Sequence, residues 1–199
     1  MNRKTPADFA PQVLRLFDQY VHGLITRQDF LRDAAPFAPP GSSAETLLED
    51  LNPRFAEACQ VAPDDARIRA RMLEYPSPRC HGKVGVTGFC YGGRIANFLA
   101  TRVPDLGAAV SFYGAEPPLT DVPQIQAPLQ IHLADKDERI NTGWPAYQAA
   151  LEAARIAYEI HHYPGTEHGF NNNTTPRFDP RAAALAWGRT LDFQRQHLG

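Results

Sequence analysis

Gly88-Phe89-Cys90-Tyr91-Gly92-Gly93 directly follows the apolar run 84–87, an order that indicates a strand turning sharply into a helix. The pattern G-x-C-x-G-G is a nucleophile elbow that carries a thiol where most such turns carry a serine. Small residues two positions before and two positions after the nucleophile let the backbone bend this tightly. The bend places Cys90 at the N-terminus of a helix, where unpaired N–H groups and the positive end of the dipole favour a thiolate. Cys90 is therefore a candidate nucleophile.

Two further strand-like runs follow Cys90 in the sequence. After each run comes a residue that could act with a nucleophile, an aspartate in one case and a histidine in the other. Run 127–134 is followed by Asp135 and Asp137, and run 157–163 leads through a turn to His168. Nucleophile, acid and histidine occur in this order, each after a strand, in α/β-hydrolases. The carboxyl ends of parallel strands share one edge of a sheet, so these side chains are predicted to meet there. The residues alone do not decide whether Asp135 or Asp137 is the acid, and either could instead be a solvated charge on a loop.

The other cysteines and histidines have simpler interpretations. Free cysteines are usually buried core residues, and we interpret Cys59 and Cys80 in this way. His161 and His162 lie within a strand pattern and are predicted to be structural. His168 precedes a glycine in a loop, so the sequence favours a catalytic role over a core position.

Composition limits the classes of function. The chain has 199 residues, a formal net charge of −2 and three cysteines. The charge gives no indication of a nucleic-acid or membrane partner. An odd number of cysteines without framework spacing suits a reducing compartment, so we expect a cytoplasmic protein. No run has zinc-ligand spacing or a phosphate-binding glycine loop, and we expect neither a metal nor an organic cofactor.

The N-terminal part is predicted to be helical. Residues 8–22 place apolar side chains at helical spacing, and Thr26-x-x-Asp29 and Ser42-x-x-Glu45 are typical of capping boxes. Residues 26–37 also resemble a degenerate twin-arginine signal, which leaves a periplasmic location as the alternative. The alternating run 68–75 is a candidate strand. We predict an N-terminal helical extension over residues 1–62 and a truncated α/β-hydrolase domain over 63–199.

The C-terminal part reads as alternating strands and helices. Helices are expected over 93–102, 144–155 and 179–197, and a further strand over 108–113. This alternation predicts an α/β fold with a mostly parallel, α/β-hydrolase-like sheet.

Four stretches together resemble the dienelactone hydrolase (carboxymethylenebutenolidase) family. They are Gly88–Gly93, the run 134–141, Gly143-Trp-Pro-Ala-Tyr147 and the run 163–170. The resemblance implies that Cys90 attacks an ester or enol-lactone carbonyl and that His168 is its base. In the family the acid precedes a stretch similar to Glu138-Arg-Ile-Asn141, which selects Asp137 over Asp135. The resemblance implies that the ester or lactone is hydrolysed through a thioester on Cys90, and that no cofactor is needed.

The chain departs from this family before the elbow. Members carry several strands and helices between their first strand and the elbow strand, whereas here residues 75–82 lead almost directly into that strand. The backbone N–H of Tyr91 is then the one oxyanion donor that the sequence identifies, and the elbow strand is expected to form an exposed edge open to homo-oligomer formation. The alternative function is therefore a catalytically weak or inactive relative that binds or oligomerises; a redox-sensing thiol with Cys80 as its resolving partner is a third.

Recognition of a substrate carboxylate is a further point on which the chain departs from the family. The family's arginine after the catalytic histidine is replaced by asparagines 171–173, so Arg139 and Arg177 are the remaining candidates for binding a substrate carboxylate.

Overall fold

The computed structural model describes residues 4–54 and 83–199, which form two compact units. The N-terminal helical unit comprises residues 4–54 together with Phe170–Pro180, and the α/β unit comprises residues 83–169 with Arg181–Gly199. The predicted boundary between residues 62 and 63 lies outside the described residues and stays a prediction. Cys59, Cys80 and the candidate strand 68–75 lie outside them as well.

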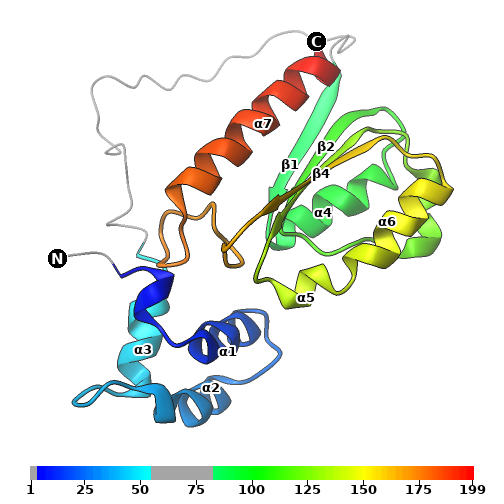
Figure 1. Ribbon diagram of the computed structural model, residues 1–199. Helices are drawn as coiled ribbons and strands as arrows, with labels where there is room; N and C mark the ends of the chain where they lie inside the picture. The colour runs from blue at the N-terminus through cyan, green and yellow to red at the C-terminus, as the bar shows by residue number, and fades with distance from the viewer. Residues whose placement is uncertain (1–3, 55–82) are drawn as a thin grey trace, which may run out of the picture. The chain divides into compact units, whose positions relative to one another are not determined.

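The α/β unit is built on a parallel four-stranded sheet in the order β1-β2-β3-β4 (Figure 1). Its strands are β1 (Val84–Phe89), β2 (Leu106–Phe112), β3 (Leu129–Ala134) and β4 (Tyr158–Tyr163). All three neighbouring pairs are parallel, as the alternation of strands and helices predicted. The fold class predicted from the sequence is therefore confirmed, and every strand ends at the same edge of the sheet.

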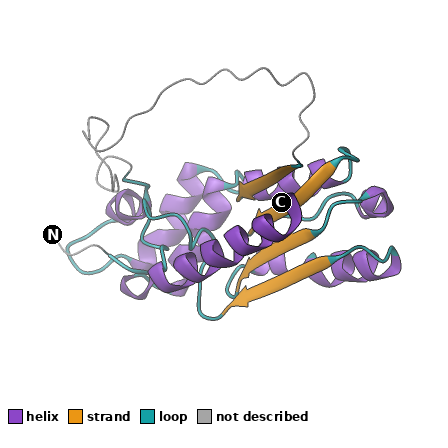
Figure 2. Cartoon of the chain, turned by 90° about the horizontal axis from the view of Figure 1, so that it is seen from above, coloured by secondary structure: helices purple, strands orange, loops and turns teal. Residues whose placement is uncertain are grey.

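Helices cover both faces of this sheet (Figure 2). The connections contain α4 (Tyr91–Ala100), η3 (Leu119–Gln124), α5 (Glu138–Asn141) and α6 (Trp144–Ala153), and the chain ends in α7 (Pro180–Leu198). The side chains of β3 alternate between two environments, because successive residues of a strand point to opposite faces. Leu129, Ile131 and Leu133 join an apolar core with α6, while His132 contacts Thr190 of α7. The three layers are therefore α4 with α6, the sheet, and α7.

The face beneath α7 carries a buried polar cluster beside the buried apolar side chains of that helix. His132 Nδ1 lies 2.7 Å from Tyr163 Oη, and its Nε2 lies 3.0 Å from Gln130 Oε1 and 3.1 Å from Thr190 Oγ1. The ring of His132 stacks on Phe112 at 4.2 Å between centroids. Burial, then the nearby charges of His161 and Arg189, lower the pKa of His132 to about 3. His132 is therefore neutral at physiological pH and joins the sheet to α7 through hydrogen bonds.

β1 is the edge of the sheet among the residues that the structure describes. It pairs with β2 on one side, and its first residue, Val84, is 61% exposed. Phe89, at its other end, is 37% exposed. The strand carries no charged residue of the kind that protects exposed edges from association.

The N-terminal helical unit contains α1 (Pro11–Val21), α2 (Arg27–Ala34) and α3 (Ala44–Leu51), with the short helices η1 (Pro6–Asp8) and η2 (Ala35–Phe37). Its core consists of apolar side chains from all three α-helices, among them Phe17, Phe30 and Leu51. The Thr26 capping box is confirmed, since Thr26 Oγ1 accepts a hydrogen bond from the Asp29 N–H at 3.2 Å.

The predicted Ser42-x-x-Glu45 capping box is wrong, and α3 begins with a simple N-cap one residue later. Ser43, not Ser42, caps α3, because Ser43 has the extended backbone of an N-cap and its Oγ accepts from the Thr46 N–H at 3.3 Å. Across the described residues, no helix combines the length and the apolar character needed to cross a membrane.

Candidate active site

The turn between β1 and α4 holds Cys90 in a strained backbone conformation. Cys90 has φ 53° and ψ −118°, a positive φ that is uncommon for a residue with a side chain. A Cβ atom on Gly88 would lie 1.9 Å from the carbonyl oxygen of Gly92, and one on Gly93 would lie 2.6 Å from the carbonyl oxygen of Phe112. Close packing of the backbone therefore requires glycine at both positions. The elbow pattern predicted this for Gly88, whereas the requirement at Gly93 comes from the structure.

The elbow pattern also predicted that a small residue is needed at Gly92, and here the structure differs. A Cβ atom at this position would meet no atom within 4 Å, so the bend does not require a small side chain two residues after Cys90. The reason is that the Gly92 carbonyl, rather than its Cα hydrogen, faces Gly88.

The structure brings Cys90, His168 and Asp137 together at the carboxyl edge of the sheet. His168 Nε2 lies 3.2 Å from Cys90 Sγ, and His168 Nδ1 lies 2.5 Å from Asp137 Oδ2. His168 and Asp137 are 4% and 3% exposed, whereas Cys90 is half-buried. The sulfur of Cys90 is therefore accessible, whereas the imidazole beside it is buried and held by Asp137.

The neighbours of His168 shift its proton affinity. Burial alone would lower the pKa of His168, but hydrogen bonds to Asp137 and Cys90, together with their charges, outweigh burial and raise the pKa to about 9. His168 can therefore carry a proton at neutral pH. The three side chains have the geometry expected of a nucleophile next to a base that a third group orients.

The two aspartates that the sequence left open have different contacts. Asp137 is buried at the N-cap of α5, where it accepts from the Ile140 N–H at 3.4 Å in addition to its contact with His168. Asp135 is exposed, and its Oδ2 accepts a hydrogen bond from the Gly165 N–H at 3.0 Å. The geometry therefore agrees with the choice of Asp137.

Tyr113 contacts the site but was not identified from the sequence. It follows β2, is 2% exposed, and its ring centroid lies 5.0 Å from that of His168. Its φ of 39° is again unusual for a residue with a side chain. Its N–H donates to the His132 carbonyl at 2.8 Å, which holds the residue at the end of the sheet. A tyrosine before a glycine at a strand end is the one signal that could have suggested it.

The remaining predicted residues have the following positions. Tyr91 is the first residue of α4, where backbone N–H groups have no partner within the helix, and its side chain is 71% exposed. Arg139 is half-buried in α5. Arg177 lies in the N-terminal helical unit, where its guanidinium is 3.5 Å from Asp18 Oδ1 and 5.2 Å from the Phe17 ring centroid. Their roles in binding substrate stay predictions.

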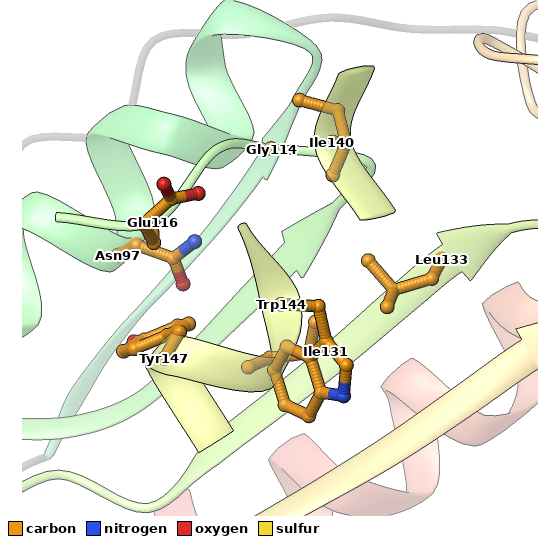
Figure 3. A pocket seen from close by; sticks show the side chains of 8 residues that line it. All are labelled: Asn97, Gly114, Glu116, Ile131, Leu133, Ile140, Trp144 and Tyr147. Atoms are coloured by element: carbon orange, nitrogen blue, oxygen red, sulfur yellow. The ribbon is translucent and has the colours of Figure 1, made fainter. Parts of the chain in front are cut away.

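A hollow of about 210 Å³, part of it open to solvent, lies on the α6 side of the sheet (Figure 3). It is lined by Asn97, Gly114, Glu116, Ile131, Leu133, Ile140, Trp144 and Tyr147. In Figure 3 the polar side chains of Asn97, Glu116 and Tyr147 lie on one side of it. Neither Cys90 nor His168 lines this hollow, so it is not the space in which a reacting carbonyl would sit.

The parallel sheet, the elbow at the end of β1 and the loops after β3 and β4 define an α/β-hydrolase-like fold. The dienelactone hydrolase family model matches residues 43–198, and a YqhI-like model matches residues 1–38. The chain belongs to the dienelactone hydrolase family, as its motifs indicated.

Individual relatives agree with this assignment. A Bradyrhizobium protein named "Probable 2-oxo-3-(5-oxofuran-2-ylidene)propanoate lactonase" is 29% identical, with 89% of this chain and 81% of that protein covered. The carboxymethylenebutenolidase of Pseudomonas putida is 33% identical, with 58% of this chain and 50% of that protein covered. A Klebsiella pneumoniae crystal structure provisionally assigned as a dienelactone hydrolase has 31% identity and a TM-score of 0.54, covering 56% of this chain and 51% of that one. The chain thus spans about half the length of the latter two.

Proposed function

We propose that this protein is a hydrolase that cleaves ester or enol-lactone bonds through a Cys90–His168–Asp137 triad and a thioester intermediate. The observation that carries the proposal is the continuous contact from Cys90 Sγ through both nitrogens of His168 to Asp137. The names of the two curated relatives describe a lactonase and a butenolidase, which supports an unsaturated lactone as the substrate class.

In the proposed first half-reaction, the Cys90 sulfur attacks the carbonyl carbon while His168 holds the thiol proton. The carbon–oxygen single bond then breaks, and the imidazolium gives its proton to the departing oxygen. In an enol lactone this oxygen stays attached to the acyl chain, and the enol becomes a ketone. The Tyr91 N–H would donate to the oxyanion from the N-terminus of α4.

In the second half-reaction water cleaves the thioester. His168 takes a proton from the attacking water, and the Cys90 sulfur departs and recovers a proton from the imidazolium. Asp137 keeps Nδ1 protonated and stabilises the imidazolium, so that Nε2 faces the sulfur in both steps. These steps use side chains of this chain and water alone.

The test is hydrolysis of a short-chain aryl ester and of an enol lactone by the purified protein. Cys90→Ala and His168→Ala are each expected to lower kcat/KM by at least about a thousandfold. His162→Ala, which removes an exposed histidine from β4, is the matched control and is expected to remain within twofold of the wild type. Full activity in Cys90→Ala would refute the proposal.

A second candidate function is favoured by the exposed end of β1. Val84 is 61% exposed on a strand without charges, a surface suited to pairing with a second copy of the chain. Light scattering after size-exclusion chromatography is expected to give a dimer that Val84→Lys converts to a monomer. A monomeric wild-type protein at all concentrations would exclude this candidate.

A further inference from the structure

The acid and the histidine of the site come from two loops that run side by side. The acid loop, residues 135–137, follows β3, and the histidine loop, residues 164–168, follows β4. The Asp135 N–H donates to the Tyr163 carbonyl at 3.3 Å, and the Lys136 N–H donates to the Thr166 carbonyl at 3.0 Å. The β3–β4 hydrogen bonding therefore continues past the ends of both strands.

A side chain of the acid loop also holds the turn of the histidine loop. Gly165 has φ +75°, a left-handed conformation that turns its N–H away from the strand pattern. This N–H donates to Asp135 Oδ2 at 3.0 Å. We call this bond the Asp135 brace. Within the turn itself, Thr166 Oγ1 donates to the Tyr163 carbonyl at 2.7 Å. Two side-chain contacts tie the histidine loop to the acid loop: the Asp135 brace, and an ion pair at 3.2 Å between Lys136 Nζ and Glu167 Oε1.

We propose that Asp135 is a positioning residue that sets the distance between Asp137 and His168 through its bond to Gly165. The inference rests on the proposed function, because it assigns a role in the same triad. Gly165 lies three residues before His168, and Asp135 lies two residues before Asp137. A bond between these points therefore fixes the separation of the two loops close to the side chains that must meet.

The consequence of losing the brace is local. Asp135 is exposed, so its removal takes little from the buried core. Release of the turn would lengthen the contact between His168 Nδ1 and Asp137 Oδ2. Among the groups of the α/β unit that face His168 are the Asp137 carboxylate, the Cys90 thiol and the ring of Tyr113. Burial lowers the pKa of His168 and the bond to Asp137 raises it, so a weaker bond lets the pKa fall.

The test compares three single variants of the full chain. Asp135→Ala removes the acceptor, and Asp135→Asn keeps a carbonyl oxygen for the Gly165 N–H. Lys136→Ala removes the other side-chain contact between the two loops, the ion pair with Glu167, and leaves the brace intact, so it is the comparison variant on the same loop. We expect Asp135→Ala to lower kcat roughly ten- to hundredfold with KM little changed, and to move the alkaline limb of kcat/KM to lower pH. We expect Asp135→Asn and Lys136→Ala to remain within about threefold of the wild type, since the Gly165 N–H keeps an acceptor in both and the ion pair of an exposed lysine contributes little.

Three results would overturn the proposal. These are an Asp135→Ala variant within twofold of the wild type, an equal loss in Asp135→Asn, and an equal loss in Lys136→Ala. Equal loss in Asp135→Asn would assign the effect to the charge, and equal loss in Lys136→Ala would assign it to any change in the loop.

A second measurement separates failure of this inference from failure of the proposed function. The rate of Cys90 alkylation by iodoacetamide, followed by peptide mass spectrometry across pH, reports the Cys90–His168 pair without turnover. Asp135→Ala is expected to shift this pH profile, whereas Asp135→Asn is expected to retain it. If the wild type lacks Cys90-dependent hydrolysis, the proposed function fails, and the alkylation profiles still decide the role of Asp135.

Discussion

The elbow around Cys90 and the Asp137–His168 pair reach the same edge of the sheet by different means. The elbow is local, since backbone atoms within residues 88–93 and the end of β2 determine its shape. The pair joins two residues that are 31 positions apart, and it depends on two loops held together by hydrogen bonds. One part of the site is therefore specified by steric limits, and the other by the pairing of β3 with β4.

This difference has a consequence for tolerance to change. Steric limits at Gly88 allow no adjustment, because any Cβ would overlap the backbone of the next turn. Hydrogen bonds between loops can lengthen by a few tenths of an ångström, which changes the chemistry before it changes the fold. Substitutions in the elbow are thus expected to disturb folding, whereas substitutions in the loops are expected to disturb catalysis.

The largest effect is expected at Gly88. Gly88→Ala places a Cβ 1.9 Å from the Gly92 carbonyl oxygen, and we expect the free energy of unfolding to fall by more than about 4 kcal/mol. Gly92→Ala is the matched variant in the same turn, where a Cβ has open space, and it is expected to stay within about 1 kcal/mol of the wild type. Thermal and urea unfolding measure both. Equal stability of the two variants would contradict the steric account.

The next effect is catalytic. Asp137→Asn removes the charge that keeps His168 Nδ1 protonated, and the new amide N–H₂ can donate to Nδ1 and select the wrong tautomer, so we expect kcat to fall about 10³- to 10⁴-fold. Because Asp137, together with Cys90, raises the pKa of His168 to about 9 against the effect of burial, losing the Asp137 charge is expected to move the alkaline limb of kcat/KM to lower pH. The wild type is expected to lose activity above about pH 9, where His168 loses the proton that the leaving group needs.

Asp105→Asn, an exposed aspartate of the α/β unit, is the control for this comparison. An unchanged alkaline limb in Asp137→Asn would separate that limb from His168.

The smallest effect concerns the polar cluster beneath α7. The pKa of His132 is about 3 in the folded chain and near 6.5 when unfolded, so the unfolded chain binds a proton that the folded chain does not. This contribution to stability is complete above about pH 6.5 and is lost on acidification towards pH 3, with a slope of up to about 1.4 kcal/mol per pH unit. Urea unfolding between pH 7 and pH 4 measures this slope.

His132→Phe keeps the stacking on Phe112 but does not titrate. We expect it to be less stable at pH 7 by about 1–3 kcal/mol, because hydrogen bonds of the cluster are lost, and to show a flatter dependence on pH. Identical slopes in variant and wild type would assign acid sensitivity to other groups.

Most of the α/β unit could be predicted from local patterns. Strand-like runs bounded by turns located all four described strands to within two residues. The pattern is strongest in β2, which is buried along almost its whole length and is apolar over residues 106–110. The polar residues within β3 were less informative, since Gln130 and His132 interrupt that pattern for partners on α7. The cap of α3 was misplaced because adjacent serines offer the same side chain, and backbone geometry selects between them.

The sequence by itself determined the elbow, the order of nucleophile, acid and histidine, and membership of the dienelactone hydrolase family. These depend on residue types that backbone sterics or chain order demand, and such demands are visible in a linear pattern. The tertiary structure alone decided which contacts Asp135 and Asp137 make, the approach of Tyr113 to His168 and the neutral state of His132. Each depends on atoms brought together from distant strands, where burial and hydrogen bonding, rather than residue type, set proton affinity and position.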